Sequence, residues 1–156
     1  MATLWATFEA YAADDFVARV EALAAERPSG DAAALFERGC AQDSTGHPAE
    51  AVVFYRAALA AGVSGIRRRR AIIQMSSSLR NLGQADEAVI LLTAELEAPS
   101  DELDDAVRAT LALALADVGR AREGVGISVG ALARHLPRYQ RSMARYAAQL
   151  AAGETR

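Results

Sequence analysis

The 156-residue sequence contains no lysine, a single cysteine and few aromatic residues, and each shortage excludes something. The lone Cys40 rules out an intrachain disulfide and any metal site built on paired cysteines. Aromatic residues make up only 6% of the chain, so alanine, leucine and valine must supply the volume of the core. Charges interrupt every stretch of about 18 residues, the length that a membrane span requires. The N-terminus also lacks the positive start and apolar core of a signal peptide, which predicts a soluble, cytoplasmic protein.

The composition favours helix. The chain has 37 alanines and few β-branched residues, which is typical of α-helix rather than β-strand. Its 17 arginines in place of lysine indicate a GC-rich bacterial genome as the source. A net charge of −3 gives no overall field that would attract nucleic acid. The charge is uneven, because residues 1–66 hold nine acidic residues and four arginines, whereas residues 136–156 hold one acidic residue and four arginines.

Three segments of the sequence repeat one pattern. Each has a glycine, a glutamate four residues later, a small residue and then a valine: GHPAEAV (46–52), GQADEAV (83–89) and GRAREGV (119–125). The glycines are 37 and 36 residues apart, and each lies between two runs of helical apolar periodicity. This predicts a helix, a glycine turn and a second helix, three times in succession. Small residues would let the paired helices approach closely: Gly39, Ala51, Ser76, Ala88, Ala112 and Gly124.

The pattern resembles the tetratricopeptide repeat family. The first repeat carries the family's positions at Gly39, Gly46, Ala51, Tyr55, Ala58 and Leu59. The second keeps Gly83, Ala88 and Leu96, and the third keeps Ala112, Gly119, Ala131 and Leu132. The sequence departs from the family at Leu92, Glu95 and Gly124, and it lacks the family's first-helix tryptophan and final proline. The resemblance implies an all-α, right-handed superhelix (α-solenoid) of antiparallel hairpins that binds other proteins.

We expect one α-solenoid domain with atypical ends. Its parts are an N-terminal helical cap over 1–30, repeats over 32–65, 69–100 and 105–137, and a C-terminal capping helix over 138–152.

The resemblance also implies a peptide-binding groove lined by the first helix of each hairpin. Carried over position by position, the groove would include Phe36, Glu37, Cys40, Asp43, Arg70, Ile73, Gln74, Ser77, Arg80, Asn81, Thr110, Leu113 and Asp117. The family's carboxylate-clamping version uses lysine and asparagine, and the first repeat has neither. The mixed lining predicts a protein or peptide partner with an acidic or carboxamide-bonding centre.

Two other functions stay open. The first is self-association as a dimer through the end helices, where an apolar stripe recurs at helical spacing: Tyr139, Met143, Tyr146 and Leu150. Arg138, Arg141 and Arg145 form a separate basic stripe on the same predicted helix. The second, more distant, is nucleic-acid binding through Arg67–Arg70, although four consecutive helical residues cannot share one face.

No catalytic constellation is evident, so the sequence predicts no enzyme, no cofactor and no metal. The run from Gly124 to Gly130 resembles a dinucleotide fingerprint, but its spacing is wrong and it follows a helix. We interpret it as a helix diluted by glycine, at a cost of about 1 kcal/mol each against alanine. The acids between Asp101 and Asp105 suit a helix start. Cys40 has no recognisable base and is expected to be a small buried side chain.

Overall fold

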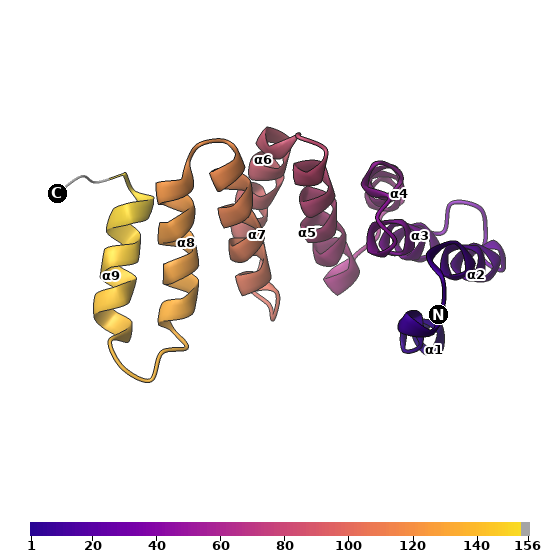
Figure 1. Ribbon diagram of the computed structural model, residues 1–156, viewed down its shortest axis with the longest axis horizontal. Helices are drawn as coiled ribbons and strands as arrows, with labels where there is room; N and C mark the ends of the chain where they lie inside the picture. Colours follow the sequence, from indigo (N-terminus) through magenta and orange to yellow (C-terminus); the bar gives the residue numbers. More distant parts are fainter. Residues whose placement is uncertain (154–156) are drawn as a thin grey trace. The chain divides into compact units, whose positions relative to one another are not determined.

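The computed structural model describes residues 1–153, and every regular element in that range is helical (Figure 1). In chain order these elements are α1 (Ala2–Trp5), the 3₁₀ helix η1 (Phe8–Ala10), α2 (Ala13–Ala25), α3 (Ala32–Ser44), α4 (Pro48–Ala60), α5 (Gly65–Asn81), α6 (Ala85–Leu96), α7 (Asp104–Asp117), α8 (Ala121–Ala133) and α9 (Gln140–Ala151). The chain forms two compact units, one of residues 1–78 and one that starts at Leu79. The expectation of an all-helical hairpin fold is confirmed.

The three repeated glycines end the first helix of each hairpin in the same way. At the first turn, the N–H of His47 donates to the carbonyl of Gln42 at 2.9 Å and the N–H of Gly46 donates to that of Asp43 at 3.1 Å. This pair of bonds is a Schellman motif, which needs the left-handed conformation that glycine adopts without strain. The φ angles are +84° at Gly46, +74° at Gly83 and +80° at Gly119. The predicted glycine turns are therefore confirmed.

The first unit is built around aromatic side chains. Helix α2 packs on α3, and α3 packs on α4. Phe16 of α2 is fully buried, with the ring centres of Trp5 and Phe8 4.8 and 4.7 Å away. The segment before α2 is thereby held against it by edge-to-face aromatic contacts, a favoured geometry. The segment expected to form an N-terminal helical cap contains α1, η1 and α2.

Small residues bring the helices of each hairpin close together. A Cβ on Gly39 would lie 2.7 Å from the ring of Tyr55, so α3 and α4 meet where a side chain is missing. In the second unit, a Cβ on Gly124 would lie 2.6 Å from the carbonyl oxygen of Ala112, which confirms the close approach of α7 and α8. A Cβ on Gly126 would lie 2.6 Å from the backbone nitrogen of Ala151 in α9. The run from Gly124 to Gly130 is helical, as interpreted, and Gly126 in addition lets α8 and α9 approach closely.

The second unit stacks its helices in chain order: α6 packs on α7, α7 on α8, and α8 on α9. Its buried apolar side chains include Leu92, Leu111 and Leu115, each at 2% exposure or less, whereas Leu132, a position shared with the family, is 55% exposed. No helix in residues 1–153 is long and apolar enough to cross a membrane.

Candidate functional site

In the first unit, the expected groove residues separate into a buried layer and an accessible layer. Phe36 and Cys40 are 0% and 2% exposed, so as they stand no ligand reaches them. The guanidinium of Arg70 on α5 lies 5.1 Å from the centre of the Phe36 ring and covers it. The surface role expected for Phe36 and Cys40 is thus corrected, because Arg70 is exposed where they are not. Ile73, Gln74 and Ser77 follow Arg70 on α5 as half-buried residues.

Glu37 is held by contacts within its own unit. The indole Nε1 of Trp5 donates to its carboxylate at 2.7 Å, and Nε of Arg67 lies 4.0 Å from the other carboxylate oxygen. The Glu37 side chain is 16% exposed. The Trp5 contact could not be predicted from the sequence, because the two residues are 32 positions apart and belong to different helices. Glu37 therefore anchors the N-terminal segment, and its remaining accessible surface is small.

A polar cluster lies beneath this surface. Asp43 accepts hydrogen bonds from Ser78 Oγ at 2.8 Å and from the Tyr55 hydroxyl at 3.4 Å. Burial raises the pKa of Asp43, and burial also raises the pKa of Tyr55. Burial raises the pKa of the Cys40 thiol to about 12, so the thiol stays protonated and is a poor nucleophile at neutral pH. The expected buried, inert Cys40 fits this environment, and the cluster joins α3, α4 and α5.

The second unit presents an apolar side chain beside an ion pair. Leu113 of α7 is 54% exposed, although α7 packs on both α6 and α8. Asp117 lies four residues later, hence on the same face of α7. Its carboxylate accepts from Nε of Arg80, on α5, at 2.7 Å. Asn81 is exposed. The Thr110 hydroxyl donates a hydrogen bond to the carbonyl of Ala106.

The arginine run does not form one basic face. Helix α5 begins at Gly65, so Arg67–Arg70 lie inside the helix rather than in a linker before it. Arg69 is 4% exposed, whereas Arg67, Arg68 and Arg70 are exposed. The four arginine side chains point to different sides of the helix, as expected for consecutive residues.

The residues expected to mediate self-association also divide. Tyr139 and Tyr146 are 73% and 40% exposed, whereas Met143 and Leu150 are half-buried on α9, which packs on α8. Only the two tyrosines thus present a large apolar surface to solvent.

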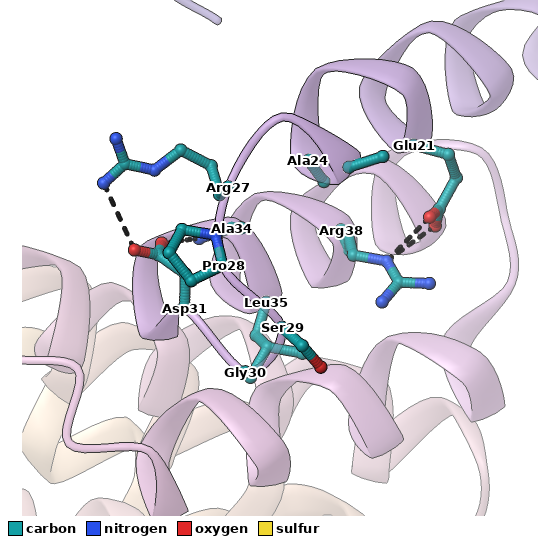
Figure 2. Close-up of a pocket in the computed structure, with 11 residues that line it drawn as sticks. Glu21, Ala24, Arg27, Pro28, Ser29, Gly30, Asp31, Ala34, Leu35 and Arg38 are labelled. Atoms are coloured by element: carbon teal, nitrogen blue, oxygen red, sulfur yellow. Dashed lines mark hydrogen bonds and ion pairs between the residues drawn. The ribbon is translucent and has the colours of Figure 1, made fainter.

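A hollow of about 440 Å³ lies at the loop between α2 and α3, and Figure 2 shows its lining. Its charged side chains are paired: Arg38 with Glu21 at 2.8 Å and Arg27 with Asp31 at 3.2 Å. Asp31 also caps α3 by accepting from the N–H of Ala34 at 2.8 Å, and this bond lowers the pKa of Asp31. We interpret this hollow as a structural joint, since its charges already have partners.

Asp105 and the two histidines of the chain have structural contacts. Asp105 receives His135 Nε2 at 2.9 Å and Arg134 at 3.0 Å, and the histidine contact lowers the pKa of Asp105. His47 lies 3.0 Å from the Thr45 hydroxyl in the first turn. Within residues 1–153, no group of three or more histidine, cysteine or acidic side chains is placed to hold a metal ion.

The comparisons with known proteins agree with the repeat pattern. A family model described as tetratrico peptide repeat matches residues 32–150, which cover the three hairpins and nearly all of α9. No curated protein and no solved structure matches the chain. The match spans more than half of the sequence, and the chain therefore belongs to the tetratricopeptide repeat family.

Proposed function

We propose that the chain is an adaptor that binds a peptide or a helix of a partner protein on exposed faces of its first hairpin helices, which are α3 and most of α5 in the first unit, and the end of α5 with α7 in the second. Members of this family generally serve as non-catalytic modules for protein–protein interaction. The proposal adds the surface and the residues. In the first unit the accessible residues are Arg70, Ile73, Gln74 and Ser77, with a small part of Glu37, and in the second they are Arg80, Asn81, Thr110, Leu113 and Asp117.

The observation that carries the proposal is the exposed Leu113 beside the Arg80–Asp117 pair. Apolar surface that stays in water is a source of binding free energy when a partner covers it. The neighbouring ion pair offers free acceptor and donor positions at its rim, which orient a ligand more than they add affinity. In the first unit, Arg70, Gln74 and Ser77 recur at helical spacing and supply donors and acceptors for a peptide backbone.

The test uses a peptide selected on the protein itself. A random displayed peptide library is selected on the immobilised protein, and the affinity of the best peptide is then measured for variants. Leu113→Glu is expected to weaken binding by about tenfold or more, which corresponds to about 1.4 kcal/mol.

The matched control is Ile90→Glu, because Ile90 is 69% exposed on the second helix α6 of the same unit. This variant should bind the peptide as the wild type does. If Ile90→Glu loses binding and Leu113→Glu keeps it, the first-helix surface is not the binding surface.

Self-association through α9 is a second candidate, favoured by the exposure of Tyr139 and Tyr146. Aromatic side chains are enriched in the cores of interfaces. Tyr146→Glu should then convert a dimer into a monomer without loss of helix. Sedimentation velocity over a dilution series measures the association state of the wild type and of the variant. A wild type that is monomeric at tens of micromolar would exclude this candidate.

A further inference from the structure

The turn from α8 into α9 surrounds a second hollow, of about 580 Å³, that the proposed first-helix surface does not include. One continuous piece of chain lines it: Pro137, Arg138, Tyr139, Gln140, Arg141, Ser142 and Arg145. Three of these seven side chains are arginines, and none is acidic. The hollow therefore has a positive lining of its own.

This positive charge is not balanced locally. The sequence has no acidic residue between Glu123 and Glu154. Two other basic side chains near the turn, Arg134 and His135, already contact Asp105. Within the described part of the chain, Arg138 and Arg141 form no ion pair, and Arg145 lies over the ring of Tyr146 at 5.1 Å. An exposed guanidinium without a carboxylate is available to an anionic ligand.

Tyr139, which lines the hollow, has an unusual backbone conformation. Its φ of 68° places it in the left-handed region, and among residues 1–153 it is the only residue other than glycine to do so. A bulky side chain in this conformation is strained, and such strain concentrates at binding sites. The ring is 73% exposed, so no packing of its own explains why a tyrosine stands here. The turn thus holds an aromatic surface next to the arginines.

The spacing of the arginines matches an extended acidic peptide. Arg141 and Arg145 are four residues apart on α9, which separates them by about 6 Å along the helix axis. Alternate residues of an extended chain are about 6.6 Å apart and point to the same side. We propose that this hollow binds an extended acidic segment of a partner protein, with carboxylates at alternate positions on Arg141 and Arg145 and the part of the segment beyond Arg141 against Tyr139.

A peptide suits the site better than a polynucleotide. Three arginines release few counterions, and the net charge of −3 repels a long polyanion. The carboxylate pairs that guanidinium groups form are bidentate, which rewards a planar acid with the stated spacing. This site is separate from the first-helix surface, so either proposal can fail without the other.

The experiment uses a fluorescein-labelled peptide, Gly-Glu-Ala-Glu-Ala-Glu-Gly, and its glutamine counterpart, with the full-length protein and fluorescence anisotropy as the readout. The acidic peptide should bind with an affinity that falls as salt rises. The double variant Arg141→Gln/Arg145→Gln should bind it at least about tenfold more weakly, since charge-assisted hydrogen bonds are lost. The matched control Arg56→Gln/Arg122→Gln removes equal charge from exposed positions of α4 and α8 and should bind normally.

Tyr139→Gly separates the role of the ring from the fold. Glycine relieves the strained backbone, so this variant should melt at a higher temperature than the wild type while it binds the acidic peptide more weakly. Leu113→Glu should leave this binding unchanged. Equal affinity of the wild type and the arginine double variant, equal binding of the glutamine peptide, absence of binding, or tighter binding of a single-stranded oligonucleotide of the same charge would overturn the proposal.

Discussion

Gly126→Ala is expected to destabilise the protein by about 2–3 kcal/mol, although alanine is the better helix former. The added Cβ would lie 2.6 Å from the backbone nitrogen of Ala151 and 2.8 Å from the carbonyl oxygen of Ala147. These are backbone atoms of α9, so relief requires that the whole helix moves away from α8. Overpacking of this kind outweighs the gain in helix propensity, which is about 1 kcal/mol.

Gly130→Ala, in the same helix α8, is the matched control with the opposite sign. A Cβ there would lie 3.7 Å from the Cβ of Ala147, an ordinary contact distance. The variant should therefore stabilise the protein by about 0.5–1 kcal/mol. Urea denaturation followed by far-UV circular dichroism measures the free energy of unfolding of both variants. If both variants stabilise, α8 and α9 do not approach as closely as the structure shows.

Gly39→Ala is expected to cost about 2 kcal/mol through a different neighbour. Its Cβ would lie 2.7 Å from ring carbons of Tyr55, and that ring is fully buried. The ring has no room to withdraw, since it packs beside Phe36 with ring centres 6.2 Å apart and its hydroxyl contacts Asp43. The clash is thus with one side chain, not with a helix backbone.

A double-mutant cycle checks this origin. In a Tyr55→Leu background, where the ring is absent, Gly39→Ala should cost at least about 1 kcal/mol less than in the wild type. The free energies of unfolding of the four proteins give the coupling. Additive costs would show that Gly39 is required for a reason other than the Tyr55 ring.

The hairpin turns could be predicted from the sequence because their determinants are local. A glycine a few residues before a small residue at the start of a helix is a local sequence signal, and Gly46, Gly83 and Gly119 all have it. Each of the three adopts a positive φ in the structure. The close approach at Gly124 was predictable for a related reason, because the repeat pattern aligns it with the alanines Ala51 and Ala88. Because the pattern occurs three times, the repeats can be aligned, and corresponding positions in the three hairpins can be identified.

Features that depend on which side chain covers which could not be predicted. Gly126 has no counterpart in the other repeats, so nothing in the sequence marks it as the contact with α9. Phe36 sits at a groove position of the family, but Arg70 folds over it. Tyr139 occupies a conformation for which sequence rules expect glycine. The arginines of α9 were visible as a stripe, whereas the hollow they line depends on the conformation of the turn.

Amide nuclear magnetic resonance with the selected peptide shows which helices the partner contacts. The protein labelled with ¹⁵N is titrated with that peptide, and the shifted amides are mapped on the helices. We expect the largest shifts within the second unit on α7 around Leu113 and at Arg80 and Asn81, and any shifts within the first unit on the accessible residues of α3 and α5, with α4, α6 and α8 little changed. Shifts concentrated on α4, α6 and α8 would contradict the proposal.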